Sequence, residues 1–304
     1  MELEQEKKER YEIIDYVTPV KEYIEGGTEL PENFHTVSKR FNGYDIDNDI
    51  KDRGKETILN EIENIQEVLF SEEFHNVVNS GLDRSQEIAP HIQMEPIKIL
   101  FLYAGPVDDG KAFRPDTVVI NMGNVRRKSD NPEVVLEHIE AYVSHEGIHI
   151  FLEQLGIKAK ESKDTVDRLS KRIWEEGLTT YMETKHFSHH EDFVNDAKFW
   201  KNVILEWDRT YTEEDHKKIL RKCLENQTYK KWHSKRIPKF EKRIEAGENI
   251  HTVFSELLRH GNGPVYQLGY ALWKEQIDSG ASLPELVQKG HKQGLEWLRS
   301  SSLQ

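Results

Sequence analysis

The spacing of apolar residues predicts that the first part of the chain mixes helices with strands. From Glu56 to about Ser80 the apolar residues recur at helical spacing, which predicts a helix. Two short and almost continuously apolar runs follow, IKILFLYA (97–104) and TVVINMG (117–123). Runs of this length predict buried strands. Residues 1–53 are charged and contain the breakers GG, LP, NG and DRG, which predict a helix followed by an irregular arm.

A long helix is predicted after the second strand. The stretch DNPE (130–133) offers an Asx cap, a proline in the first turn and a glutamate at the spacing of a capping box. The helix should end at Gly156, because glycine is favoured just past a helix C-terminus. The apolar positions of this helix include Val135, Ile139, Tyr142, Val143 and Leu152.

From about Asp164 to the C-terminus nearly every segment has helical spacing. A small sheet with helices therefore precedes a purely helical region, and the pattern predicts the α+β class. The chain length of 304 residues allows one large domain or two lobes. We predict three parts: an N-terminal arm (1–53), a lobe of sheet and helix (54–160) and a helical lobe (161–304).

The composition of the chain argues against some classes of binding partner and indicates the cellular compartment. The chain has 42 basic and 55 acidic side chains, a formal net charge of -13, and no long Lys/Arg block, so nucleic acid and anionic membranes are poor partners. Its single cysteine, Cys223, excludes an internal disulfide and a cysteine-based metal cage, and fits a reducing compartment. We find no apolar signal segment at the charged N-terminus, and no run of the roughly 20 apolar residues that a membrane span needs. These features predict a cytoplasmic protein.

The long helix contains the stretch SHEGIHIFLEQLG (144–156), in which two histidines are four residues apart. Residues at this spacing project from one helix face, so His145 and His149 can direct two imidazole nitrogens at one zinc ion. Glu146 is offset by one residue and can take a proton from a water molecule on the metal, whose pKa zinc lowers to about 7. The alternative is that both histidines lie on a solvated or half-buried face, where Glu146 only aids solubility.

A catalytic zinc site usually has three protein ligands and one open position, so a third ligand is required. The predicted helix RIWEEGLTTYMETKHF (172–187) places Glu175 and Glu176 directly before Gly177 in an apolar surround. Because glycine has no Cβ, we expect the backbone at Gly177 to approach the histidine helix closely, with a carboxylate beside the contact. The alternative is an ordinary amphipathic helix.

These residues resemble a family. The stretch WEEGLTTYME (174–183) is similar to the W-x-N-E-G-F-A-x-Y-x-E segment of the aminopeptidase-type gluzincins, which are zinc metallopeptidases with a zincin-like (thermolysin-like) catalytic domain. The resemblance implies that Glu176, not Glu175, is the third ligand. The 26 residues between His149 and Glu176 exceed the usual connection of the family, and we assign the excess to the polar segment GIKAKESKD (156–164), where insertions are tolerated.

A tyrosine near the C-terminus adds to the resemblance. GPVYQLGYALWKEQIDSG (263–280) is similar to the P-Y-x-x-G-x-A-L segment of the family, in which a tyrosine hydroxyl faces the zinc. The matching residue is Tyr266, and a phenol proton aimed at a tetrahedral oxyanion would stabilise its charge. Tyr270 is the competing candidate on the same face, and His260 is a weaker second donor. The alternative is that both tyrosines are core aromatics.

The chain also departs from the family pattern. The aminopeptidases carry a G-x-M-E-N segment whose glutamate holds the free amine of the substrate, and TVVINMGNV (117–125) has no glutamate. Exopeptidase activity is therefore not implied. We expect an exposed edge at strand 117–123 to pair with an extended peptide, and Asn121 and Asn124 to contact the substrate backbone. The alternative is a plain sheet edge.

Together these patterns predict a zinc-dependent hydrolase of peptide or other amide bonds. His145, His149 and Glu176 would hold Zn²⁺, Glu146 would act as the general base, and Tyr266 would stabilise the oxyanion. The expected partner is a peptide or protein substrate, and the oligomeric state is open. The first alternative is a zincin-like binding or regulatory module with a structural or inactive metal site. The second is a helical scaffold whose motif is accidental.

Overall fold

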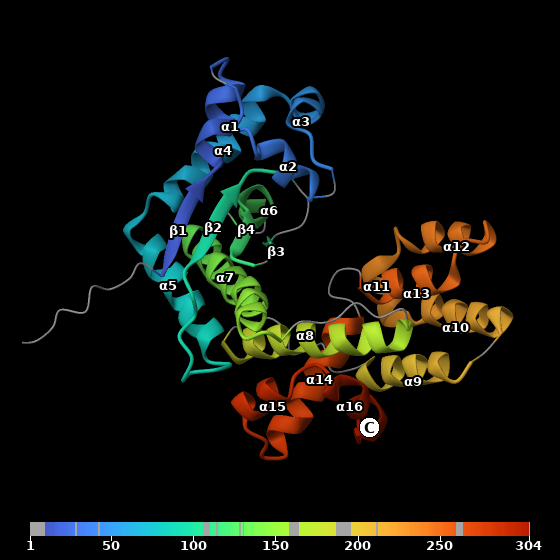
Figure 1. Cartoon of the computed structure of the whole chain (residues 1–304). Helices are drawn as coiled ribbons and strands as arrows, with labels where there is room; N and C mark the ends of the chain where they lie inside the picture. Colours follow the sequence, from blue (N-terminus) through green and yellow to red (C-terminus); the bar gives the residue numbers. More distant parts are fainter. Residues whose placement is uncertain are drawn as a thin grey trace, which may run out of the picture. The chain divides into compact units, whose positions relative to one another are not determined.

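A computed structural model gives the fold, and its helices and strands are labelled in Figure 1. The described residues fall into two compact units, Met1–Gly156 and Ile157–Gln304. No helix among these residues has both the length and the apolar character needed to cross a bilayer. The residues that the structure describes are 10–27, 29–41, 43–105, 110–113, 115–127, 129, 131–157, 164–186, 196–210, 212–259 and 264–303.

The described part of the first unit contains a mixed four-stranded sheet with the order β1-β2-β4-β3 (Figure 1). β1 pairs with β2 and β2 with β4 in parallel, whereas β3 runs antiparallel to β4. The two strands predicted from apolar runs are confirmed as β2 and β4. β4 lies inside the sheet, and β3 lies at its edge. The strand bounds are β1 (Tyr11–Asp15), β2 (Ile97–Leu102), β3 (Gly110–Phe113) and β4 (Thr117–Asn121).

The prediction of a helix and an irregular arm at the N-terminus is wrong for its described residues. Instead, β1 joins the sheet, with Ile13 paired to Ile99 of β2. The sequence YEIID is too short to show a period, and its strand form depends on pairing with a partner far along the chain. The helices that follow β1 are α1 (Val17–Ile24), α2 (Phe34–Lys39) and α3 (Ile46–Arg53).

The helix predicted from Glu56 to about Ser80 is two helices, α4 (Lys55–Leu69) and α5 (Glu72–Gln86). The break lies at Ser71, whose backbone is extended with ψ at 153°. The hydroxyl of Ser71 donates a hydrogen bond to the carbonyl of Val68 at 2.9 Å, which closes the end of α4. The apolar spacing continues across this break, so periodicity alone could not reveal it.

The predicted histidine helix is confirmed as α7 (Pro132–Gln154), which follows the short α6 (Met122–Arg127). The side chain of Asn131 accepts a hydrogen bond from the amide of Glu133 at 3.0 Å, and Pro132 occupies the first turn. The Asx cap predicted from the DNPE stretch is therefore present at Asn131, whereas Asp130 lies outside the described residues.

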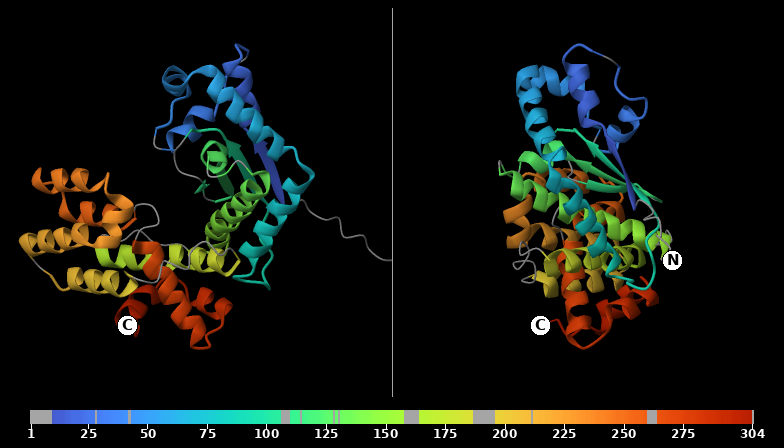
Figure 2. Two further views of the ribbon diagram at one scale, coloured as in Figure 1. Left: turned by 180° about the vertical axis from the view of Figure 1, so that it is seen from behind. Right: turned by 90° about the vertical axis from the view of Figure 1, so that its left-hand side faces the viewer.

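α7 packs closely against α5 on one side (Figures 1 and 2). A Cβ at Gly147 would overlap Oγ of Ser85, so only glycine allows this approach. The same hydroxyl donates a hydrogen bond to the carbonyl of Ser144 at 3.0 Å. Gly147 is two residues, and hence about 200° of helical rotation, from both His145 and His149. Since Gly147 faces α5, the two histidines project from the opposite side of α7.

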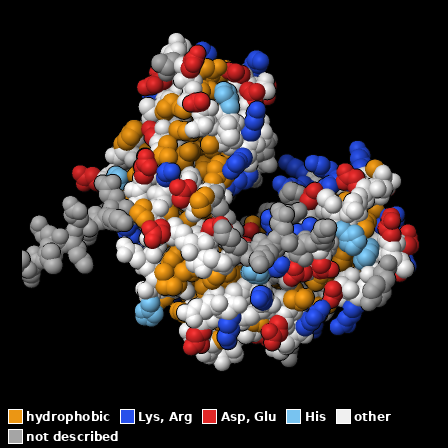
Figure 3. All heavy atoms as spheres, in the orientation of Figure 1, with side chains coloured by type: hydrophobic (Ala, Val, Ile, Leu, Met, Phe, Trp, Pro, Cys, Tyr) orange, Lys and Arg blue, Asp and Glu red, His pale blue; other side chains and the backbone are white. Residues whose placement is uncertain are grey.

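All elements of the second unit that the structure describes are helices, as the sequence predicts. Lys and Arg side chains gather over α11 and α12 in the space-filling view (Figure 3). The helices are α8 (Thr165–His186), α9 (Ala197–Asp208), α10 (Glu213–Glu225), α11 (Gln227–His233), α12 (Ile237–Glu245), α13 (Ile250–Arg259), α14 (Pro264–Asp278), α15 (Leu283–Lys289) and α16 (Gln293–Ser300).

α8 and α14 cross in direct backbone contact at Gly177 and Gly269 (Figure 2). A Cβ at Gly269 would overlap the carbonyl oxygen of Ile173 and the backbone of Gly177. Nε1 of Trp273 on α14 also donates a hydrogen bond to the carbonyl of Trp174 on α8 at 2.7 Å. The three atoms nearest to a Cβ at Gly177 all belong to Gly269, so this glycine serves the crossing with α14 rather than the predicted approach to the histidine helix.

We expect Gly269→Ala to destabilise the second unit by about 1–3 kcal/mol, because the added methyl group meets backbone atoms that cannot rotate away. Urea unfolding followed by circular dichroism measures this loss. Lys274→Ala on the exposed side of α14 is the matched control and should change stability by less than about 0.5 kcal/mol. Equal stability of the two variants would contradict the close crossing.

Candidate metal centre

The two histidines of the HEGIH stretch lie together on α7. Their ring centroids are 5.2 Å apart, as expected for side chains at i and i+4 on one helix face. His149 is buried, with 7% of its surface exposed, and His145 is half-buried. The helix is otherwise largely buried around them, through residues that include Val143, Ile148 and Ile150. The pair therefore lies at the margin of an apolar core.

Glu146 points toward the edge of the sheet in the same unit. A Cβ built on Gly110 of β3 would lie 3.4 Å from Cγ and 3.6 Å from Oε1 of Glu146. The carboxylate of Glu146 is thus close to the edge strand. Nothing in the sequence of β3, GKAF, marked it as a strand or as a neighbour of the histidine helix.

The carboxylate predicted as the third ligand belongs to a group of possible metal ligands. One ring nitrogen from each of His145 and His149 and one carboxylate oxygen of Glu176 all lie within 4.8 Å of one another. Ligand atoms around a tetrahedral zinc, each about 2.0–2.2 Å from the ion, are about 3.4 Å apart. Side-chain rotation that brings these atoms closer together, by up to about 1.4 Å, would therefore give the spacing of a zinc site. Two imidazoles and one carboxylate are also a ligand set that catalytic zinc sites use.

The neighbouring carboxylate, Glu175, is directed elsewhere. Burial lowers the pKa of His291, and the charge of Glu175 is among those that oppose this shift, so the Glu175 carboxylate is near that imidazole. Of the two adjacent glutamates, only Glu176 belongs to the group of possible metal ligands found among the described residues. This is the choice that the family resemblance implied.

The two candidate tyrosines differ in their surroundings on α14. Tyr270 is buried, with 9% of its surface exposed, and its ring centroid lies 6.3 Å from that of Tyr181 on α8. Tyr266 is half-buried, one turn ahead of Gly269. Glu176 adjoins Gly177, so the backbones of Glu176 and Tyr266 both lie near the point where α8 and α14 cross. His260, the weaker candidate for an oxyanion donor, lies outside the described residues.

The prediction of an exposed edge at strand 117–123 is wrong. β4 pairs on both sides, with β2 and with β3, so it offers no free edge. The side chain of Asn121 is fully buried and accepts hydrogen bonds from the amides of Ala104 at 2.9 Å and Gly123 at 3.2 Å. These bonds hold the turns at the ends of β2 and β4. Asn124, on α6, is half-buried. The predicted contacts of Asn121 and Asn124 with substrate depended on a free edge at β4, and we do not carry them further.

No family model matches the chain, and no curated protein or solved structure shows significant similarity to it. We therefore infer the metal centre from the chemistry and arrangement of these side chains alone.

We expect Glu176→Gln to weaken zinc binding far more than Glu175→Gln, because a neutral amide is a poor zinc ligand. The loss of zinc affinity should exceed the roughly 10–100-fold loss that follows when a ligand is kept but the residue hydrogen-bonded to it is removed. Equilibrium dialysis followed by metal analysis measures both variants, which differ only in the position of the same chemical change. Equal zinc affinity in the two variants would remove Glu176 from the ligand set.

Proposed function

We propose that the protein is a zinc-dependent hydrolase that cleaves peptide or other amide bonds, with a zincin-like catalytic domain of the gluzincin type. The observation that carries this proposal is the grouping of His145, His149 and Glu176 within ligand distance. A zinc ion held by these side chains would lower the pKa of a bound water to about 7 and polarise the carbonyl of the substrate.

We assign Glu146 the role of general base. It neighbours His145 in sequence, and it is not a member of the group of possible ligands. Its carboxylate can therefore accept a proton from the attacking water and pass that proton to the leaving amine. Because this carboxylate is close to Gly110, the proposed proton transfer would take place next to the edge strand β3.

β3 replaces β4 as the proposed strand for substrate pairing. Among the described residues its only partner strand is β4, and in this proposal an extended peptide pairs with its other edge. Pairing of a peptide with a strand edge supplies main-chain hydrogen bonds that do not depend on the side chains of the substrate. A peptide bound there would run past the carboxylate of Glu146. The edge strand thus supports a peptide or protein as the substrate class.

Tyr266 is the proposed oxyanion donor. Its side chain is half-buried and begins near the α8–α14 crossing, beside the helix that carries Glu176. A phenol retains its proton at neutral pH, with a reference pKa of about 10, and can donate a hydrogen bond to the developing negative charge. Tyr270 is packed against Tyr181 and is assigned to the core.

The cytoplasm is the proposed compartment. Cys223 is the single cysteine of the chain, and its side chain is completely buried. Burial raises the pKa of this thiol, so it stays protonated and unreactive. A chain without a disulfide depends on no oxidising environment for its stability.

We expect Glu146→Gln to retain stoichiometric zinc while hydrolysis falls by about 10²–10⁴-fold, because the amide cannot accept the proton of the attacking water. The substrate in this test is a mixture of unstructured synthetic peptides whose cleavage is followed by mass spectrometry, with zinc content measured on the same samples. Full activity in the variant would contradict the mechanism. Stoichiometric zinc in a wild-type protein that cleaves none of the peptides would favour a binding or regulatory module.

A further inference from the structure

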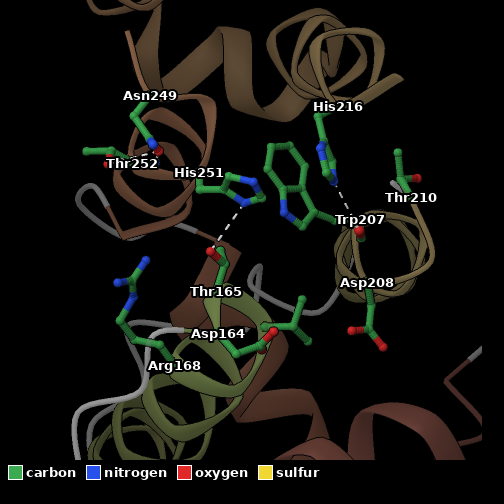
Figure 4. A pocket seen from close by; sticks show the side chains of 11 residues that line it. Asp164, Thr165, Arg168, Trp207, Asp208, Thr210, His216, Asn249, His251 and Thr252 are labelled. Carbon is green, nitrogen blue, oxygen red and sulfur yellow. Dashed lines mark hydrogen bonds between the residues drawn. The ribbon is translucent and has the colours of Figure 1, made fainter. Parts of the chain in front are cut away.

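A polar cavity of about 390 Å³ lies within the helical unit and includes none of the candidate metal ligands in its lining. It is formed by the beginnings of α8 and α13, the end of α9 and one residue of α10 (Figure 4). The side chains that matter for its chemistry are Asp164, Arg168, Trp207, Asp208, His216 and His251.

The indole of Trp207 is held so that only its edge is free. The ring of Phe254 stacks on it with centroids 3.7 Å apart, and the ring of His216 lies 4.2 Å away. Two rings at such short distances occupy the two faces of the indole. The imidazole of His251 meets the indole at 86°, with centroids 5.5 Å apart. The side chain is 3% exposed, and its neighbours prevent the ring from turning its nitrogen elsewhere.

The nitrogen on that edge has no hydrogen-bond partner in the described part of the chain. Nε1 of Trp207 is buried and unpartnered, and so is Nε of Arg168. In Figure 4 the ring nitrogen of Trp207 lies on the side of the indole that faces Thr165 and Asp164. A buried donor without an acceptor costs about 1–3 kcal/mol, and more for a charged group. Two such donors beside one cavity therefore indicate an acceptor that enters it.

The two carboxylates that line the cavity each have at least one partner. Asp208 forms an ion pair with Arg299 at 3.1 Å. Asp164 accepts a hydrogen bond from the backbone amide of Asp167 at 2.7 Å, which caps the start of α8. Nε2 of His216 lies 3.3 Å from the carbonyl oxygen of Trp207. Among the described residues that line the cavity, the buried polar atoms without a partner are thus both donors, Nε1 of Trp207 and Nε of Arg168.

The helix N-termini at the cavity also favour an anion. α8 and α13 both begin at the cavity, with Thr165 in the first turn of α8 and Thr252 in the first turn of α13. Helix N-termini carry a partial positive charge and favour anions. Burial, and next the charge of His216, lowers the pKa of His251, so this imidazole contributes hydrogen bonds at neutral pH rather than charge.

We propose that this cavity binds a small oxyanion, a carboxylate or a phosphate group, which accepts hydrogen bonds from Nε1 of Trp207 and from the guanidinium of Arg168. The pairing of a fixed indole N–H with a guanidinium defines an acceptor of at least two oxygens, which suits both groups. The anion site is independent of the proposed hydrolysis, so a failure of the hydrolase proposal would not affect it.

Two-dimensional ¹H–¹⁵N NMR of the indole signals tests the proposal. The chain has six tryptophans, and the variant Trp207→Phe identifies the signal of Trp207. We expect inorganic phosphate or acetate, titrated against sodium chloride at equal ionic strength, to shift that signal to saturation. A response to acetate alone indicates a carboxylate ligand, and a response to phosphate alone indicates a phosphate ligand. Arg168→Gln should weaken the response at least about 10-fold, because the charged donor is lost.

Trp174→Phe is the matched control, because Nε1 of Trp174 is also buried without a partner among the described residues but does not line this cavity. This variant should bind the anion as the wild type does. Undisturbed signals of the other tryptophans in Arg168→Gln show that its fold is retained. A Trp207 signal that neither anion moves, or that moves equally in Arg168→Gln, would overturn the proposal.

Discussion

The absence of a side chain at a few helix contacts is the constraint on which the rest of the structure depends. Gly177 and Gly269 let α8 and α14 touch backbone to backbone, and Gly147 lets α7 press against Ser85 of α5. Each contact lies beside a candidate ligand, since Gly147 separates the two histidines and Gly177 follows Glu176. A contact that admits no Cβ also permits little sliding or rotation. The helices that carry the proposed ligands are thus fixed in direction by their own units.

This rigidity bears on the chemistry that the side chains can perform. A metal site needs ligands held close to their working positions, and ligands on packed helices are held more firmly than ligands on loops. His149 is nearly buried, and His145 and Glu176 are half-buried, so the water exposure of the group is limited. The anion cavity has the same character, because Phe254 and His216 fix the indole of Trp207. At the candidate metal centre and at the anion cavity, packing thus restricts the orientation of the polar side chains that would bind a ligand.

The sequence predicted correctly those structural features that depend on only a few neighbouring residues. The Asx cap at Asn131 follows from side-chain chemistry within a few residues, and the common face of His145 and His149 follows from helical geometry. Features that depend on distant partners were missed or misplaced. β1 and β3 are strands because β2 and β4 pair with them, and neither has a clear alternation of its own. The partner of Gly177 is 92 residues away in sequence, and no local pattern identifies it.

The central claim is that two imidazoles of α7 and the carboxylate of Glu176 bind one zinc ion. Anomalous diffraction at the zinc absorption edge, from crystals of the zinc-loaded protein, tests it most directly. The account predicts one strong anomalous peak, about 2.0–2.2 Å from a nitrogen of His145, a nitrogen of His149 and an oxygen of Glu176. A zinc peak bound elsewhere, with these three side chains apart from it, would contradict the account.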